Sequence, residues 1–209
     1  QMLIKIIMYY APIGIGAYFA SFVGEFGAGV ATSYLKMLII YTVSCAFVYF
    51  VIYSLYAFIS GGKNGLKLYW QNIMVPSATA LATCSSAASI PVNTKAAKNI
   101  GVSDDIADTI IPLGTSFHKD GSIIGSVFKI MFLVYLFGVD VSTFKVLGVS
   151  ILATILITAV PIGGGTISEM LIISLMGFPI ASLPILTIIA TIIDAPATLL
   201  NVVGDSASS

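Results

Sequence analysis

The stretch that decides the fold is IDAPATLLNVVGD, residues 193–205, in an apolar region near the end of the chain. If it is helical, its four polar residues stand at positions i, i+4, i+7 and i+11 and form one stripe on an apolar surface: Asp194, Thr198, Asn201 and Asp205. Ionisable groups inside a membrane are costly and mark substrate or ion pathways. The stretch therefore predicts a membrane helix with a cation and substrate site.

The composition of the whole chain supports a membrane protein. It is 58% hydrophobic and 9% charged, whereas a soluble domain carries about 25% charged residues. Nine basic and nine acidic residues balance, so nothing indicates a nucleic-acid partner, and every basic residue is Lys. We expect Cys45 and Cys84 to be small buried thiols. Because the chain opens with Gln1, we expect an N-terminally truncated sequence, the C-terminal portion of a longer protein.

Residues 2–23 and 33–60 are apolar and long enough to cross a bilayer as helices, which takes about 20 residues. Several later apolar segments are too short to span, and Ser, Gly and Pro-rich breaks lie at 84–91, 116–122 and 160–166. Irregular backbone at membrane depth is tolerated only where protein buries it or where it lines a cavity. We therefore expect the first and third breaks to be tips of re-entrant hairpins and the second to be an unwound turn.

The predicted fold is an all-α membrane protein with spanning helices and two oppositely oriented re-entrant hairpins. The lysines at 63, 67, 95 and 98 would share the cytoplasmic side, so the first hairpin opens from the cytoplasm and the second from outside. The predicted elements are a helix at 33–60, a re-entrant hairpin at 66–101, a broken helix at 104–138, a second re-entrant hairpin at 141–177 and a helix at 182–205.

Four motifs resemble, in order and spacing, those of the dicarboxylate/amino acid:cation symporters, the glutamate transporter family. They are MYYAPIG at 8–14, TCSSAASIPV at 83–92, PLG at 112–114 followed by DGS at 120–122, and the stretch at 193–205. The resemblance implies a homotrimeric amino acid symporter in the cell membrane, which we expect to be a bacterial inner membrane. Residues 1–30 would belong to a scaffold, and 33–209 to a transport part that moves like an elevator.

The same resemblance implies two sets of site residues. The substrate would contact the hairpin tips, the unwound turn and the last helix at Ser85, Ser86, Ser122, Gly163, Gly164, Asp194, Ala197, Thr198 and Asn201. Asp194 would receive the α-amino group of the substrate as a charge-assisted pair. The coupling cation, sodium or a proton, would be held by Gly114, Ser116, His118, Asp120, Asn201 and Asp205, since hard cations prefer oxygen donors.

Departures from the family pattern point to the substrate class. Ala197 stands where transporters of acidic substrates carry Arg, and Cys84 stands at the position that carries it in other members. A neutral amino acid such as serine, threonine, alanine or cysteine is therefore the expected substrate. The alternative is that Lys119 supplies the missing positive charge, which would admit acidic amino acids, dicarboxylates or cystine.

The unwound turn also departs from the family, whose Asn-Met-Asp-Gly-Thr reads His118-Lys119-Asp120-Gly121-Ser122 here. His118 titrates near neutral pH when unperturbed. Two interpretations of His118 are open. In the first, the transporter couples to protons or uses fewer sodium ions per cycle; in the second, His118 only makes a local hydrogen bond.

Other polar and aromatic residues receive simpler expectations. Glu169 either binds a cation or Lys119, or faces water at a gate. Lys129 and Asp140 should lie near membrane interfaces by snorkelling, and aromatic residues such as Tyr53 should be interface anchors.

An intramembrane hydrolase is disfavoured because GxSxG and HExxH are absent, so we expect no enzyme. A channel would not need a substrate-shaped set of polar residues on the last helix.

Overall fold

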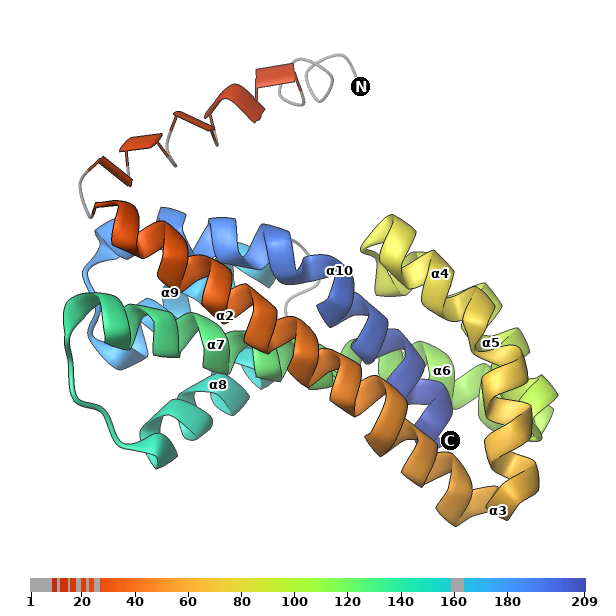
Figure 1. Ribbon diagram of the computed structural model, residues 1–209. Coiled ribbons are helices and arrows are strands. Elements are labelled where there is room, and N and C mark those ends of the chain that lie inside the picture. Colours follow the sequence, from red (N-terminus) through yellow and green to blue (C-terminus); the bar gives the residue numbers. More distant parts are fainter. Residues whose placement is uncertain are drawn as a thin grey trace. The chain divides into compact units, whose positions relative to one another are not determined.

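The computed structural model describes residues 9–10, 12–14, 16–17, 20–21, 23–24, 27–158 and 164–209 (Figure 1). Within these ranges the regular elements are all helices, as the sequence predicts. The chain divides into two compact units, residues 1–39 and 40–209. Each unit is described by itself, and the candidate site lies within the second.

A long apolar helical stretch leads into the second unit. It consists of α2 (Ala28–Phe47), the π-helix η1 (Val48–Ile52) and the first part of α3 (Tyr53–Asn72). Gly62 interrupts α3 with φ 59° and ψ −149°, a conformation that glycine adopts without a steric penalty. The predicted helix at 33–60 therefore ends at a glycine kink, where the chain changes direction (Figure 1).

A helical hairpin occupies the first predicted hairpin region. The arms are the second part of α3 with α4 (Met74–Thr83), and α5 (Ser86–Ile100), which packs against α4. Cys84 ends α4 in the left-handed region with φ 48°. Ser85 caps α5, because its Oγ accepts a hydrogen bond from the Ala88 N–H at 3.2 Å. The turn lies at the predicted tip, and the re-entrant path through a membrane stays a prediction.

The broken helix and the second hairpin region follow. Helices α6 (Asp104–Phe117) and α7 (Asp120–Phe137) are separated at His118 and Lys119, where the sequence predicts the unwound turn. Helices α8 (Thr143–Thr158) and α9 (Gly164–Met176) pack against each other. Between them, residues 159–163 lie outside the described residues.

The last helix, α10 (Leu183–Ser208), follows the short 3₁₀ helix η2 (Ile180–Ser182) and contacts α4, α5, α7 and α9. Its second half is buried almost continuously from Leu200 to Ala207. Helices α7 and α10 approach closely at Gly121, where an added Cβ would lie 2.7 Å from the Ala197 Cα. Glycine at this crossing lets α10 lie directly beside the break between α6 and α7.

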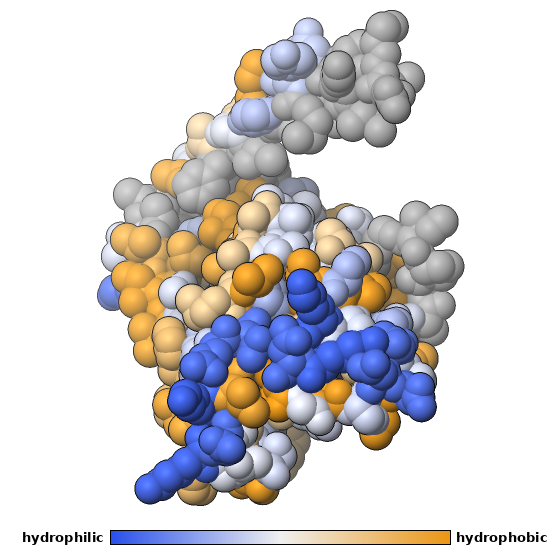
Figure 2. Space-filling view, turned by 90° about the vertical axis from the view of Figure 1, so that its right-hand side faces the viewer, coloured by the Kyte–Doolittle hydropathy of each residue, from blue (hydrophilic) through white to orange (hydrophobic). Residues whose placement is uncertain are grey.

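The surface agrees with a multi-pass membrane protein. Three stretches are long and apolar enough to cross a membrane: Thr32–Asn72, Asp104–Phe137 and Ile180–Ser208. Large apolar side chains such as Phe144 and Ile155 are 87% and 57% exposed. Figure 2 shows hydrophilic residues gathered in one band of the visible face, with apolar residues over much of the remainder. Such extensive exposed apolar surface is typical of a membrane or protein contact rather than of water.

Candidate functional site

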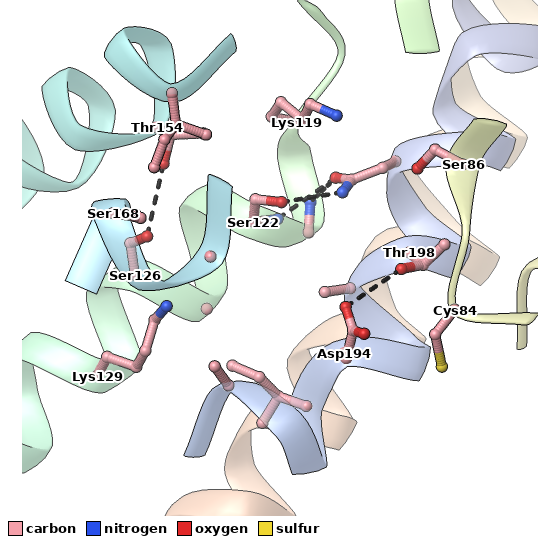
Figure 3. Close-up of a pocket in the computed structure, with 18 residues that line it drawn as sticks. Cys84, Ser86, Lys119, Ser122, Ser126, Lys129, Thr154, Ser168, Asp194 and Thr198 are labelled. Carbon is pink, nitrogen blue, oxygen red and sulfur yellow. Dashed lines mark hydrogen bonds between the residues drawn. The ribbon is translucent and has the colours of Figure 1, made fainter. Parts of the chain in front are cut away.

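A pocket of about 300 Å³ opens among α7, α8, α9, α10 and the turn between α4 and α5 (Figure 3). This volume is at the lower end of the range for small-molecule sites. Six residues assigned to the substrate by resemblance line it: Ser86, Ser122, Asp194, Ala197, Thr198 and Asn201. Ser85 caps α5 instead, Gly164 begins α9, and Gly163 lies outside the described residues.

One wall of the pocket is the polar stripe of α10. The helix continues through Pro196, so Asp194, Thr198 and Asn201 keep the helical spacing and face the same space. The Thr198 hydroxyl donates to Asp194 Oδ1 at 3.4 Å. Asp194 is exposed toward the pocket, and no cationic side chain in the described ranges lies within 4.0 Å of its carboxylate. The wall therefore presents an anion that a ligand's positive charge can reach.

Asn201 joins α10 to the start of α7. Its Oδ1 accepts hydrogen bonds from the Gly121 N–H at 3.0 Å and the Ser122 N–H at 3.3 Å, and its Nδ2 donates to Ser122 Oγ at 2.9 Å. The first N–H groups of a helix have no partner within the helix. Asn201 supplies that partner from a neighbouring helix, so the pocket wall and the helix break are fixed to each other.

Behind this wall, two carboxylates flank a histidine. His118 Nε2 lies 3.0 Å from Asp120 Oδ2, and His118 Nδ1 lies 3.7 Å from Asp205 Oδ1. The Tyr53 hydroxyl is within hydrogen-bonding distance of both Asp120 Oδ2, at 3.1 Å, and the Leu200 carbonyl, at 3.0 Å. Tyr53 is fully buried, so its expected place at a membrane interface is wrong. No pattern in the sequence marks this contact, because tyrosines occur both at membrane interfaces and in buried positions.

The residues suggested for a cation are only partly brought together. Gly114, His118 and Asp205 line one hollow, with Asp120 joined through His118. Ser116 is exposed and lines neither this hollow nor the main pocket, and Asn201 lines the main pocket. In the described ranges, no three His, Cys, Asp or Glu side chains are grouped to hold a metal ion.

Asp205 nevertheless carries an unused buried acceptor. Its side chain is 2% exposed, and within the described part of the chain Oδ2 has no hydrogen-bond partner. A Cβ at Gly114 would clash with this carboxylate, so the glycine permits the approach of α6. A buried anionic oxygen without a partner is unfavourable unless a cation or a proton reaches it. The Asp205 carboxylate is thus a candidate ligand for a proton or for a hard cation, which prefers oxygen donors.

Three residues lie where the sequence did not lead us to expect them. Lys129 is 7% exposed and Glu169 is 1% exposed, with Lys129 Nζ 4.0 Å from Glu169 Oε1. The prediction that Lys129 snorkels to the membrane interface is wrong, because its side chain is buried next to Glu169. Glu169 contacts Lys129 rather than Lys119 or water. Cys84 is exposed and lines the pocket, so only Cys45 is the buried thiol we expected.

Asn93 is a further buried polar residue that the motifs did not single out. Its Nδ2 donates to the Val202 carbonyl at 2.8 Å, and its Oδ1 accepts from Ser206 Oγ at 2.7 Å. These bonds hold α5 against α10. Asn93 is therefore a buried polar link between two helices that contribute to the pocket.

Comparisons with known proteins identify the family of the chain. The model of the sodium:dicarboxylate symporter family matches residues 1–209. The chain is 28% identical over 213 residues to neutral amino acid transporter B(0) of Mus musculus, with 99% of this chain and 38% of that protein covered. It is 28% identical over 221 residues to human neutral amino acid transporter A, with coverage of 99% and 40%. The chain thus spans about two fifths of these relatives, which are transporters rather than enzymes.

Proposed function

Because the chain belongs to the sodium:dicarboxylate symporter family, we propose that it forms the substrate-binding part of a cation-coupled symporter for a small neutral amino acid. The observation that carries this proposal is the Asp194 carboxylate, which faces the pocket beside Thr198. An ammonium group beside a carboxylate forms a charge-assisted pair. The α-amino group of an amino acid is the ligand group that this wall fits.

The neutral side chain of the substrate is inferred from Ala197. Its methyl group lines the pocket one helical turn from Asp194, at the position where the family resemblance places Arg in transporters of acidic substrates. A substrate carboxylate would find no guanidinium, since the chain has no Arg. The names of both similar relatives, which are neutral amino acid transporters, support the same substrate class.

An acidic amino acid, a dicarboxylate or cystine is the second candidate substrate. Lys119 favours it, because this residue lines the pocket and its Nζ donates to the Thr115 carbonyl at 2.8 Å. Within the described part of the chain, no carboxylate lies within 4.0 Å of this ammonium. A substrate carboxylate would supply the missing anion.

For the coupling ion we propose sodium at Asp205, where the buried Oδ2 atom has no partner among the described residues. The alternative is a proton, carried by His118 between Asp120 and Asp205. The family resemblance further suggests a homotrimer with an elevator-like motion, in which residues 33–209 travel against a scaffold that includes residues 1–30.

Uptake by the full-length protein in proteoliposomes tests this function. With an imposed sodium gradient, we expect labelled serine or alanine to accumulate, and we expect unlabelled substrate inside to drive counterflow. Accumulation that follows only a proton gradient would select the proton alternative. Conductance without substrate exchange would indicate a channel and contradict symport.

Changing Ala197 to Arg should alter the substrate class. The new guanidinium lines the pocket near Asp194 and can pair with a side-chain carboxylate, so aspartate or glutamate should gain about tenfold in affinity relative to alanine. A competition panel on the full-length protein measures this ratio. Ala197→Lys is the matched variant, with the same charge but without the planar fork, and we expect a smaller gain. An unchanged ratio in both variants would contradict the placement of the substrate side chain near Ala197.

A further inference from the structure

The side of the pocket away from Asp194 is also polar, although no motif marks it. Four of its lining residues come from α7, α8 and α9, and Figure 3 shows them together, across from Asp194 and Thr198: Ser126, Lys129, Thr154 and Ser168. Ser126 Oγ and Thr154 Oγ1 are 3.5 Å apart. A ligand held by its amino group at Asp194 would therefore extend toward hydrogen-bonding groups rather than toward an apolar wall.

Lys129 is the group on this side with unused capacity. It is 7% exposed, it lines the pocket, and its ammonium has three N–H donors. Among the described residues its closest anionic atom is Glu169 Oε1 at 4.0 Å, beyond hydrogen-bonding distance. Buried donors are normally satisfied. Because Lys129 lines the pocket, a ligand atom bound there can accept hydrogen bonds from its ammonium.

Glu169 determines what kind of acceptor the ammonium can take. Its side chain is 2% exposed, and its Oε2 accepts a hydrogen bond from Thr187 Oγ1 at 2.6 Å, which fixes the carboxylate beside Lys129. The positive charge of Lys129 is therefore already balanced. If a ligand brought a second carboxylate, the buried site would hold two negative charges and one positive charge. Such an excess of negative charge in a buried place is unfavourable.

We propose that Lys129 is a specificity-determining residue whose ammonium, charge-balanced by Glu169, donates a hydrogen bond to a neutral oxygen in the substrate side chain. This inference rests on the proposed function and narrows the substrate class to hydroxyl- or amide-bearing amino acids, such as serine, threonine and asparagine. Alanine and valine would lose the bond, and aspartate would be rejected by Glu169.

The test is a ratio of affinities on the full-length protein. Serine carries a hydroxyl that alanine lacks, and threonine carries a hydroxyl where valine carries a methyl group. A ratio of two affinities measured on one sample is independent of the fraction of folded protein. In the unaltered protein serine should bind about tenfold more tightly than alanine, the scale of one hydrogen bond to a charged group. Lys129→Met should reduce this ratio to about one, whereas Lys145→Met, which changes an exposed lysine on α8, should leave it unchanged.

Two further variants complete the test. Glu169→Gln keeps the shape and the acceptor for Thr187 but removes the balancing charge, so aspartate should gain about tenfold relative to serine. The double variant Lys129→Met with Glu169→Gln removes the unpaired buried acid that the single lysine change leaves. The double variant should bind alanine and show a ratio of serine affinity to alanine affinity near one. It therefore tests the role of Lys129 even if Lys129→Met alone does not fold.

The outcomes separate this inference from the function on which it rests. If the unaltered protein binds no amino acid, the proposed function fails and the role of Lys129 fails with it. If alanine and serine bind equally well, or if Lys129→Met weakens both to the same extent, the symporter stands and the role of Lys129 is overturned. Equal weakening would place the α-carboxylate, rather than the side chain, at this ammonium.

Discussion

Replacing Asp194 with Asn should raise the dissociation constant of every amino acid substrate by about 100-fold or more. Asp194 is the anion on the α10 wall of the pocket, and Thr198 orients one of its oxygens. The amide keeps the size of the side chain but leaves the substrate ammonium without an opposite charge. Breaking one partner of a desolvated ion pair costs about 3–5 kcal/mol, and each 1.4 kcal/mol is tenfold in affinity.

Binding of radiolabelled substrate to the purified full-length protein measures this effect. The matched control is Asp105→Asn, the same chemical change at an exposed position in the first turn of α6, and substrate affinity should stay within twofold. Equal affinities of the Asp194→Asn variant and the unaltered protein would mean that the amino group binds elsewhere.

Replacing Asp205 with Asn should weaken the dependence of substrate binding on sodium. The Asp205 carboxylate is buried, and its Oδ2 atom has no partner among the described residues, so an amide there removes the negative charge that we propose to face the cation. We expect the half-activating sodium concentration to rise by about tenfold or more. A hydrogen bond to a charged group contributes about 1.5–3 kcal/mol, we take the loss of the carboxylate charge to be of similar size, and each 1.4 kcal/mol is tenfold in affinity. A sodium titration of substrate binding shows the shift.

Asp140→Asn provides the control for this titration, since Asp140 is exposed after the end of α7. Its sodium curve should overlay that of the unaltered protein. If Asp205→Asn also overlays it, while substrate still binds, then Asp205 is not the sodium ligand. Loss of dependence on a proton gradient in the same variant would instead favour the proton as coupling ion.

The secondary structure follows from signals that are local in the sequence. Residues 118 and 119 interrupt a helix because the apolar run stops at a cluster of polar and charged groups, and Cys84 and Ser85 form a turn between two short apolar segments. The polar stripe on α10 needs only helical periodicity. For this reason, the four substrate residues that the resemblance suggests on α10 line one pocket: Asp194, Ala197, Thr198 and Asn201.

Contacts between distant segments are what the sequence could not specify. Tyr53 and Asp120 are 67 positions apart, and Lys129 and Glu169 are 40 positions apart. A lysine in an apolar helix is consistent with either snorkelling or a buried pair, and only the packing of α9 against its neighbours decides between them. Likewise, Asn201 lines the pocket, but the sequence does not indicate that its amide also accepts hydrogen bonds from the first N–H groups of α7, about 80 positions away.

In the proposed function, the carboxylate on α10 holds the amino group of the substrate. A high-resolution structure of the full-length protein with its tightest-binding amino acid tests this placement. We expect the substrate nitrogen within about 3 Å of an Asp194 carboxylate oxygen, with the substrate side chain extending toward Lys129. A substrate bound outside this pocket, or bound with its carboxylate rather than its nitrogen toward Asp194, would show that Asp194 does not hold the amino group.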